Sequence, residues 1–409
     1  MAKKKILIIG AGDFQLPLVQ KAAKNCEVYL AAPEIDERFS SIVNKTLITD
    51  VRNKDIILEF ARVNHIDGVI TDQTDVAVRT VAYVAEKLEL PGIGYDTSCL
   101  FSNKAKMRLK LKELGIDVLP NKNVFSLSEA LDFFDSLKND VIIKPVDTQG
   151  SRGIYLCKNK EDIISNFEKT LQWSKDKGIV IEKYASGREF FVESIVYNYD
   201  YKPLILGDCK QFESKNVFSS KERIVPSDAD FQLQESVLKL NEKIIRGFGL
   251  KQGISQSEYI TDNNKVYLVE TGARGGGGYT SSDFVNLMTG VDTENFLINI
   301  ALGQCNRLPA FKLKEVACQY IAFYLPKGKV LSVEGLREVL NLPYVHRNQI
   351  EKLYVGYENR KENTDKTSRY IIVISAQNRE ELKQRANKIK SMLKIQVDTI
   401  SGIKGPIWQ

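Results

Sequence analysis

The segment Ile254–Gly278 carries the residues with the most specific chemistry in this sequence. Glu258 lies in an alternating polar and apolar run, a polar turn follows at Asp262–Lys265, and Glu270 ends a second alternating run. This pattern predicts a β-hairpin that brings the two carboxylates side by side. Such neighbours repel each other, and Mg²⁺, which usually binds one or two carboxylates together with nucleotide phosphates, relieves the repulsion. For the hairpin alone, two surface glutamates remain the alternative.

Lys144 and the loop after it suit phosphate binding. The lysine ends an apolar strand and precedes the stretch 145–153, which is rich in small residues. Backbone N–H groups of such a loop can surround phosphate oxygens while the lysine supplies positive charge. The Walker A pattern GxxxxGK[ST] does not occur in the sequence. Taken alone, the segment fits an ordinary hairpin turn equally well.

A third segment could recognise a nucleoside. A strand ends in Glu182, Lys183 and Tyr184, a turn follows at 186–187, and Glu189 opens the next strand. The backbone of such a hinge can bind the edge of an adenine, and a nearby carboxylate can accept hydrogen bonds from ribose hydroxyls. Because glutamate and lysine on a strand usually form a solvated face, this segment is weak by itself.

Composition narrows the classes of function. With 409 residues and 43% hydrophobic content, the chain can form two or three packed domains. The net charge of +6 is spread along the sequence without a basic arm, which argues against nucleic acid and suits anionic small molecules. His65 and His346 are the two histidines, and neither has a nucleophilic serine or cysteine nearby, so we expect no Ser-His-Asp hydrolase. The first apolar run is too short for a membrane span, which predicts a cytoplasmic protein.

Alternating strands and helices must position these residues in the first part of the chain. Residues 5 to about 95 follow this alternation, which predicts a doubly wound parallel sheet. The turn Gly10-Ala11-Gly12 is followed by Gln15 at the third glycine position of the dinucleotide fingerprint. We therefore expect a tight turn whose helix N-terminus could hold an anionic substrate group rather than NAD.

The rest of the chain mixes strands and helices differently. Helices are expected near 98–119, 230–248 and 379–392. Strands are expected at 140–145, 153–158, 179–184, 188–197 and 203–212, and later near 317–325, 350–357 and 369–375.

Taken in order, the segments resemble the ATP-grasp superfamily over about residues 1–305. The residues that carry the resemblance are Asn103-Lys104, Lys144 with its loop, 182–189, Glu258, and Glu270 to Arg274. It implies an α/β and α+β fold with a doubly wound N-terminal domain (1–97), an ATP-grasp core and a smaller α+β domain (307–409). The core would comprise subdomains 98–185, with a lid loop at 147–153, and 186–306. The region beyond Arg307 resembles L-amino-acid ligases, with a biotin-carboxylase-type or purine-biosynthetic cap as the alternative.

The resemblance also implies cofactors and residue roles. ATP and Mg²⁺ are the implied cofactors, with Mn²⁺ as an alternative metal held by Glu258 and Glu270. Arg274 would bind the reacting acyl phosphate, and Lys210 and Arg223 are further catalytic candidates, for which a solvated basic loop is the alternative. Nucleotide contacts are implied for Lys104, Lys144, Gly150, Ser151, Gly153, Glu182, Lys183, Tyr184, Glu189 and Leu268.

Two positions depart from the pattern of the superfamily. Gly272 stands where the final metal motif usually has asparagine, and Gln256 stands where histidine often precedes the first glutamate. The number of bound metal ions, one or two, therefore remains open.

The implied reaction joins a carboxylate to an amine through an acyl phosphate, with release of ADP and phosphate. The partners would be small-molecule acid and amine substrates, without nucleic acid or membrane, and a homodimer is a reasonable expectation. Three alternatives stay open: an ATP-dependent carboxylase that uses bicarbonate, a non-catalytic ATP-binding module, and an NAD-dependent or nucleotide-sugar oxidoreductase built on the first domain.

Overall fold

The structure is a computed structural model that describes residues 2–214, 216–360 and 368–409. The chain forms two compact units. Unit 1 comprises residues 1–121, 191–205 and 230–312, and unit 2 comprises residues 122–190, 206–229 and 313–409. Each unit is therefore assembled from three separate stretches of the sequence.

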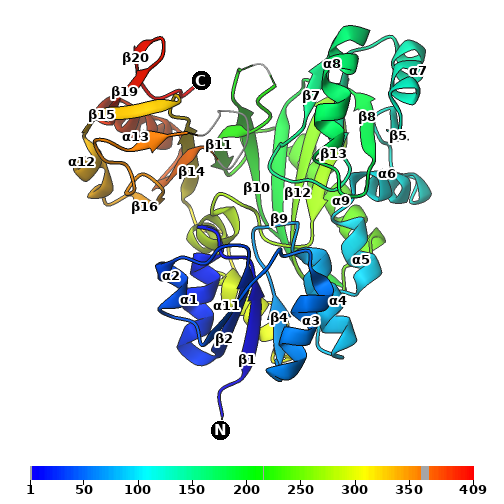
Figure 1. Cartoon of the computed structure of the whole chain (residues 1–409), viewed down its shortest axis with the longest axis vertical. Coiled ribbons are helices and arrows are strands. Elements are labelled where there is room, and N and C mark those ends of the chain that lie inside the picture. Colours follow the sequence, from blue (N-terminus) through cyan, green and yellow to red (C-terminus); the bar gives the residue numbers. More distant parts are fainter. Residues whose placement is uncertain (1, 215, 361–367) are drawn as a thin grey trace. The chain divides into compact units, whose positions relative to one another are not determined.

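Unit 1 begins with a parallel four-stranded sheet in the order β3-β2-β1-β4 (Figure 1). Its strands are β1 (Lys5–Ile9), β2 (Glu27–Ala32), β3 (Lys45–Ile48) and β4 (Gly68–Ile70). The helices of this part are α1 (Leu16–Asn25), α2 (Glu37–Ser40), α3 (Lys54–Val63), α4 (Val78–Lys87), α5 (Tyr95–Leu100) and α6 (Lys104–Glu113).

Helices cover both faces of this sheet. Ile6 and Ile8 of β1 belong to a core shared with α1 and α11 (Thr293–Ala301), whereas Leu7 and Ile9 belong to a core shared with α3 and α4. Successive residues of a strand point to opposite faces, so a strand buried on both sides reads as one continuous apolar run. This explains the sequence KILII in β1 and confirms the predicted doubly wound arrangement.

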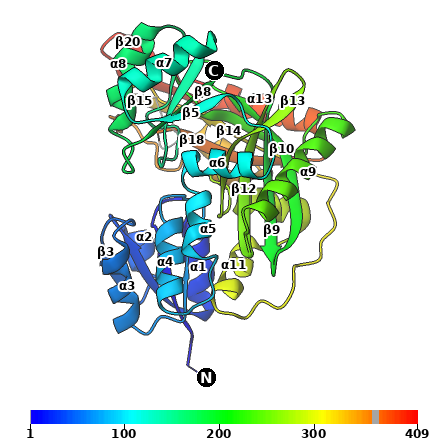
Figure 2. The same cartoon turned by 90° about the vertical axis from the view of Figure 1, so that its right-hand side faces the viewer.

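The rest of unit 1 holds the glutamate hairpin. The strands β9 (Glu189–Tyr197), β12 (Gln252–Asp262) and β13 (Lys265–Gly272) are neighbours in the order β13-β12-β9. Helix α9 (Phe231–Gly247), which precedes β12 in the chain, is labelled with β12 in the second view (Figure 2). The elements η1 (Thr280–Phe284) and α10 (Val285–Thr289) follow β13 in the sequence.

Unit 2 contains three groups of strands. The sheet β5-β8-β6-β7 is formed by β5 (Asn121–Val124), β8 (Ile179–Lys183), β6 (Val141–Pro145) and β7 (Tyr155–Cys157), with α7 (Leu127–Leu137) and α8 (Lys160–Leu171) packed on one face. A second group has the order β10-β11-β14-β18-β16: β10 (Asp200–Gln211), of which residues 206–211 belong to unit 2, β11 (Ser220–Val225), β14 (Ala317–Phe323), β18 (Tyr370–Ala376) and β16 (Val345–Asn348). A third, β17-β15-β19-β20, contains β17 (Glu358–Asn359), β15 (Gly328–Glu334), β19 (Lys394–Thr399) and β20 (Gly402–Lys404).

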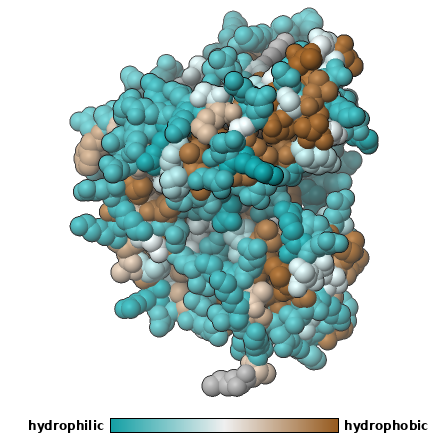
Figure 3. Space-filling view, turned by 90° about the vertical axis from the view of Figure 1, so that its left-hand side faces the viewer, coloured by the Kyte–Doolittle hydropathy of each residue, from teal (hydrophilic) through white to brown (hydrophobic). Residues whose placement is uncertain are grey.

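Helix α13 (Arg379–Met392) packs its apolar face on the second group, and α12 (Leu336–Leu340) lies in the same core. The mixture of one parallel sheet with antiparallel ones confirms the predicted fold class. On the face drawn in Figure 3, hydrophilic side chains dominate and apolar ones gather in small groups. Among the described residues, no helix combines the length and the apolar character that a membrane crossing requires.

Two local predictions differ from the structure. The expected strand at 350–357 is a series of turns, because its buried residues, Ile350 and Leu353, are three apart rather than two, and Tyr354 and Val355 are exposed. The expected helix near 98–119 is divided into α5 and α6, since the side chain of Asn103 accepts a hydrogen bond from the Lys106 N–H and starts a new helix.

Candidate functional site

The hairpin β12–β13 in unit 1 places the two predicted metal ligands directly opposite each other. Glu258 pairs with Glu270 in the antiparallel register, next to a bulge at Val269 of β13. The turn is formed by Asn263 and Asn264, whose φ angles of 48° and 62° suit a tight two-residue hairpin turn. Directly opposed side chains in such a pair lie on one face with Cβ atoms about 5 Å apart. The sequence therefore predicted both the hairpin and its register.

Lys104 contacts the second of these glutamates. Its Nζ lies 2.8 Å from Oε1 of Glu270, and the lysine is buried at the start of α6. The helix itself is held against β13, because Arg108 donates a hydrogen bond of 2.8 Å to the carbonyl of Val269. Two residues predicted from separate motifs are thus brought together. Leu268, predicted to contact the nucleotide, is buried two residues earlier on β13.

Gln256 links the hairpin glutamates to Arg274. Its Nε2 donates to Oε1 of Glu258 at 3.3 Å, and its Oε1 accepts from Nη1 of Arg274 at 2.9 Å. An amide donates through its nitrogen and accepts through its oxygen, so Gln256 can serve Glu258 and Arg274 at the same time. The departure from the superfamily pattern at this position therefore has a defined structural use.

The guanidinium of Arg274 is already engaged by a carboxylate of unit 1. Its Nε and Nη2 donate to the two oxygens of Asp75, each at 2.7 Å, in a bidentate pair. Burial opposes the charged form, but the adjacent Asp75 prevails and the pKa of Arg274 is raised. A substrate carboxylate would have to compete with Asp75 for this planar fork.

The glycines after Arg274 are held by two buried acids that the sequence analysis did not select. The Gly275 N–H donates to Oδ1 of Asp72 at 2.8 Å, and the Gly276 N–H donates to Oε2 of Glu193 at 3.1 Å. A Cβ at Gly275 would lie 2.5 Å from Oδ1 of Asp72, and one at Gly276 would collide with the Glu193 carboxylate. These glycines therefore allow close approach of the backbone to two carboxylates.

Asp72 is the more unusual of the two acids. It is fully buried directly after β4, and no hydrogen bond to its Oδ2 is found among the described residues. Burial raises the pKa of Asp72 to about 6. Burial, together with the charge of Asp72, also raises the pKa of the neighbouring Glu294 to about 7. The position of Asp72 at the carboxyl end of a parallel strand, in GVITD, was the available sequence signal.

The Gly10–Gly12 turn is filled by Gln15. Oε1 of Gln15 accepts from the Gly12 N–H at 2.9 Å, and its Nε2 donates to the carbonyl of Asp72 at 2.7 Å. The Gly12 N–H is therefore already hydrogen-bonded to a side chain of unit 1. The residue that breaks the dinucleotide fingerprint thus occupies part of the turn where a phosphate would have to approach.

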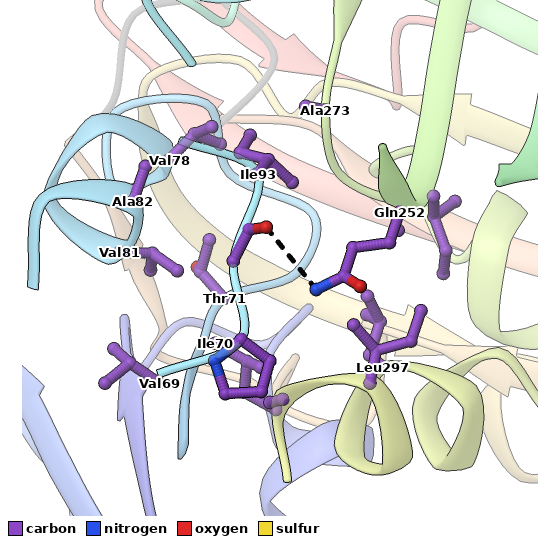
Figure 4. A pocket seen from close by; sticks show the side chains of 16 residues that line it. Val69, Ile70, Thr71, Val78, Val81, Ala82, Ile93, Gln252, Ala273 and Leu297 are labelled. Carbon is purple, nitrogen blue, oxygen red and sulfur yellow. Dashed lines mark hydrogen bonds between the residues drawn. The ribbon is translucent and has the colours of Figure 1, made fainter. Parts of the chain in front are cut away.

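A small apolar pocket lies deeper in unit 1, among β4, α4, α11 and the start of β12 (Figure 4). Its volume is about 60 Å³, and Gln252 closes one side by donating a hydrogen bond to the carbonyl of Gly92. Thr71 and Ala273, which precede Asp72 and Arg274 in sequence, also line it. A ligand of ordinary size needs several times this volume, so we assign no substrate to this pocket.

In unit 2, Lys144 forms a buried ion pair with Glu182. Nζ of Lys144 lies 2.6 Å from Oε1 of Glu182, and the two side chains are 9% and 2% exposed. Lys144 lies one residue before the end of β6, two residues from Ile142, which pairs with Glu182 of β8, so both side chains project from the same face of this sheet. Helices α7 and α8 cover the other face. The two predicted nucleotide contacts are thus direct partners.

The predicted lid loop has an anchored backbone with three residues at positive φ. Gly150, Ser151 and Gly153 have φ angles of 74°, 63° and 70°. Ser151 Oγ donates to the carbonyl of Phe218, and a Cβ at Gly153 would lie only 2.6 Å from the Trp173 ring. Left-handed residues turn successive N–H groups toward one side, an arrangement that can bind anions.

The hinge residues lie beside one another at the end of β8. Tyr184 donates its N–H to the carbonyl of Asp140 at 2.9 Å, and Lys183 precedes it as the last residue of the strand. Burial, with the charge of Glu189, raises the pKa of the Tyr184 hydroxyl. Glu189 itself accepts a hydrogen bond from Nε2 of Gln211.

The two remaining catalytic candidates lie on opposite faces of the β10–β11 pair. Lys210 pairs in register with Glu222 and contacts it at 3.4 Å, whereas Arg223 pairs with Cys209 and is buried. A further arginine that the sequence analysis did not select, Arg369, is buried against the ring of Tyr320, which pairs in register with Arg223. The structure therefore does not bring Lys210 and Arg223 to one site.

Residues 137–283 match the ATP-grasp domain family. The chain contains an ATP-grasp domain. The match spans the predicted lysine, lid, hinge and hairpin residues from Lys144 to Arg274, and Lys104 precedes it. The recognition made from the motifs is thus confirmed at the level of the superfamily, whose ligases use ATP and Mg²⁺.

Curated relatives of this ATP-grasp chain are distant. The large chain of carbamoyl phosphate synthase from Clostridium perfringens strain SM101 is 23% identical over 384 residues, which cover 87% of this chain and 35% of the relative. Alanine--anticapsin ligase from Bacillus subtilis is 22% identical over 300 residues, covering 67% and 62%. The chain spans about a third of the length of the carbamoyl phosphate synthase chains it matches.

Solved structures share the whole fold. An L-amino acid ligase from Bacillus licheniformis superposes with a TM-score of 0.81 at 20% identity, over 98% of this chain and all (100%) of that one. Phosphoribosylglycinamide synthetase from Anaerococcus prevotii gives 0.75 at 19% identity, over 96% and 99%. Biotin carboxylase from Campylobacter jejuni gives 0.74 at 17% identity, over 99% and 93%. The whole chain, including its C-terminal region, therefore shares its fold with these three structures.

Proposed function

We propose that the chain is an ATP-dependent ligase that joins a carboxylate to an amine. In the first step a substrate carboxylate oxygen attacks the γ-phosphorus of ATP, and ADP leaves. The amine nitrogen then attacks the acyl carbon, phosphate leaves, and the nitrogen loses a proton to give the amide. The observation that carries the proposal is the pairing of Glu258 with Glu270 on one hairpin face, with Lys104 at 2.8 Å.

The hairpin glutamates fit Mg²⁺ held together with phosphates. Among residues 2–214, 216–360 and 368–409, no group of three or more His, Cys, Asp or Glu side chains is arranged to hold a metal ion. Two carboxylates with room for phosphate oxygens are the common protein contribution to a Mg²⁺ site. Glu258 and Glu270 would hold the ion, whose charge would draw electron density from the transferred phosphoryl group.

The protein's own groups then act by charge and position. Lys104 in unit 1 and Lys144 in unit 2 are each candidate cations for phosphate oxygens, and the lid residues Gly150 to Gly153 in unit 2 are candidates for backbone N–H contacts. Phosphoryl transfer needs positioning and neutralisation of charge more than a protein nucleophile. That requirement agrees with a chain that has only two histidines. Arg274, held by Asp75, also donates to the carbonyl of Gly275 and so keeps the glycine turn in place.

Bicarbonate as the activated acid is the second candidate. The fold is shared with biotin carboxylase, in which the comparison covers nearly the full length of both chains. In this version carboxyphosphate replaces the acyl phosphate, and the amine receives a carboxyl group. The homodimer expected from the sequence stays a prediction, which light scattering after size exclusion would test.

A screen for ADP release tests the proposal. The full chain would be incubated with ATP, Mg²⁺ and pools of amino acids, sugar amines and small carboxylates, with and without bicarbonate. We expect ADP release that needs an acid and an amine together and does not need bicarbonate. Dependence on bicarbonate would favour the carboxylase, and ATP binding without turnover in any pool would favour a non-catalytic module.

A pair of variants ties activity to the hairpin. Glu270→Gln keeps the size of the side chain but loses a charged ligand, so ADP release should fall by about a hundredfold or more. Glu242→Gln is the control, because Glu242 lies on the exposed face of α9 and pairs with Arg246. Equal activity of the two variants would contradict the metal assignment.

A further inference from the structure

A polar pocket of about 290 Å³ lies within unit 2, between α13 and the strands β10, β11 and β14. Most of its lining side chains are charged or carry an amide. They come from β10, β11, β14 and α13, with Asp228 from the loop after β11. The lining residues used below are Lys210, Gln319, Arg379, Glu380, Lys383 and Asn387. Its volume approaches the lower end of the range for small-molecule sites, so a ligand of few atoms would fit.

The pocket lies on the opposite face of the strands from Arg223. Ile224 pairs with Gln319 and Arg223 pairs with Tyr320 in the register of β11 with β14. Ile224 and Gln319 line the pocket, so the alternate residues Arg223 and Tyr320 point to the other face. The pocket is therefore separate from the buried arginine that was predicted to face substrate.

Ion pairs frame two sides of the pocket. Lys210 contacts Glu222 at 3.4 Å, and Nη2 of Arg379 lies 2.9 Å from Oδ2 of Asp228. Arg379 also contacts Asp208 at 2.8 Å, which fixes the first turn of α13. These pairs give the pocket a wall of fixed charges of both signs.

Three polar side chains on α13 face the same pocket with their charges or amides available. Glu380, Lys383 and Asn387 are exposed and follow the i, i+3, i+7 spacing of one helix face. Within the described ranges, no ion pair or hydrogen bond of these side chains is found. A negative and a positive group thus stand one turn apart on the pocket wall.

Gln319 points to a ligand independently of these surface groups. Its side chain lines the pocket although the residue is only 3% exposed. No hydrogen bond of its amide is found in the part of the chain that the structure describes. The amide atoms are open to the pocket, because they are not among the fully buried polar atoms that lack a hydrogen bond, and a bound molecule with polar groups can pair with them.

We propose that this pocket binds a small zwitterion that carries an ammonium and a carboxylate, such as a free amino acid or a dipeptide. Lys383 meets the carboxylate, Glu380 meets the ammonium, and Gln319 with Asn387 binds the polar atoms between or beside them. A ligand with a single charge would leave one of the two helix charges unmatched. The proposal concerns a second site and does not rest on the proposed ligase activity.

Binding to the full-length chain without ATP tests the site. Each proteinogenic L-amino acid and L-alanyl-L-alanine would be screened by saturation-transfer difference NMR, and the binders titrated by calorimetry. We expect at least one binder, with a loss of affinity of roughly tenfold or more in Lys383→Glu and in Glu380→Lys. The N-acetyl and the carboxamide forms of that binder, which each lack one charge, should bind as weakly.

Matched variants separate this site from others. Lys388→Glu is the charge control, because Lys388 is exposed on the same helix and does not line the pocket; it should bind like the unchanged protein. Gln319→Leu should also lose affinity while keeping its melting temperature within a few degrees. Absence of any binder, or binding unaffected by Lys383→Glu and Glu380→Lys but lost in Arg274→Ala, would overturn the proposal.

Discussion

Each of the two units holds a buried lysine in an ion pair with a glutamate, and the pairs differ in how far water reaches the carboxylate. Glu182, the partner of Lys144 in unit 2, is 2% exposed, whereas Glu270, the partner of Lys104 in unit 1, is 30% exposed. A fully buried pair loses hydration on both sides and must stay intact. A half-exposed carboxylate can exchange its lysine for another cation. The pair of Lys144 with Glu182 therefore suits a fixed part of a site, and the pair of Lys104 with Glu270 suits a site that takes up a metal ion.

The largest expected effect is on the stability contributed by the buried pair of Lys144 with Glu182. Glu182→Ala would leave the Lys144 cation buried without its partner, which should lower the free energy of unfolding by about 3–5 kcal/mol. Urea unfolding followed by tryptophan fluorescence would measure it, because Trp173 lies at the lid loop of unit 2. If the free energy of unfolding fell by less than about 1 kcal/mol, water would reach the pair of Lys144 with Glu182.

A double variant separates charge from packing in the same pair. Replacing both partners, in Lys144→Met with Glu182→Met, removes the two buried charges together, so most of the stability should return. ATP binding, measured by calorimetry, should stay impaired because the phosphate-binding cation is missing. Recovery of ATP affinity in this variant would remove Lys144 from the nucleotide site.

The next effect concerns a buried carboxylate that has no lysine. Burial raises the pKa of Asp72 to about 6, although the Gly275 N–H lowers it in part. Because the folded pKa lies above the unfolded value of about 3.9, protonated Asp72 favours the fold below that value, and this contribution is lost as the pH rises through about 6. Asp72→Asn should therefore stabilise the chain by about 2 kcal/mol at pH 8 and by much less at pH 4.

Melting temperatures of Asp72→Asn and the unchanged chain between pH 4 and pH 8 would check this. Asparagine keeps an oxygen for the Gly275 N–H, so the glycine turn should persist. Glu294, whose pKa is raised by burial and by Asp72 to about 7, remains in the variant and should titrate lower. A stability difference that does not change with pH would contradict the burial of a titrating Asp72.

In the pair of Lys104 with Glu270, loss of the glutamate should affect ligand binding more than stability. Glu270→Ala removes a carboxylate that water reaches but leaves the buried Lys104 cation behind, so the free energy of unfolding should fall by about 1–2 kcal/mol, less than in Glu182→Ala. The same variant should lose the stabilisation that Mg²⁺ with a nonhydrolysable ATP analogue gives to the unchanged chain, measured as a shift in melting temperature. A stability loss as large as that of Glu182→Ala would show that the two pairs are equivalent.

The sequence predicted the parts of the site that are local. The hairpin register follows from alternation around Asn263-Asn264, and Lys144 at the end of β6 follows from one apolar run. The sequence did not identify Asp72 and Asp75 as part of the site. Their contacts to Gly275 and Arg274 join segments about 200 residues apart. The spacing of apolar residues does not predict such a contact, which becomes evident in the folded structure from the short distance between the glycine backbone and the carboxylate.

The composition of the two units could not be predicted from local patterns either, and the domain bounds 1–97, 98–306 and 307–409 stay a prediction. Each unit gathers three stretches, such as 191–205 inserted between parts of unit 2. Short runs of apolar residues predict strands, but they do not say which strands become neighbours. Likewise Lys210 and Arg223 lie close in sequence yet face opposite sides, since the pairing of β10 with β11 decides their faces.

The smallest effect tests the hairpin that opposes the two glutamates. Asn264 has a φ of 62°, a conformation that costs an L-residue energy and costs glycine almost none. Asn264→Gly should therefore raise the free energy of unfolding by about 0.5 kcal/mol while preserving the register, because Asn-Gly is a preferred two-residue turn. ADP release should be unchanged. Asn264→Val is the opposing variant, since a β-branched residue is strained at this φ, and it should reduce both stability and ADP release. If Asn264→Val left ADP release untouched, the turn would not be what keeps Glu258 opposite Glu270.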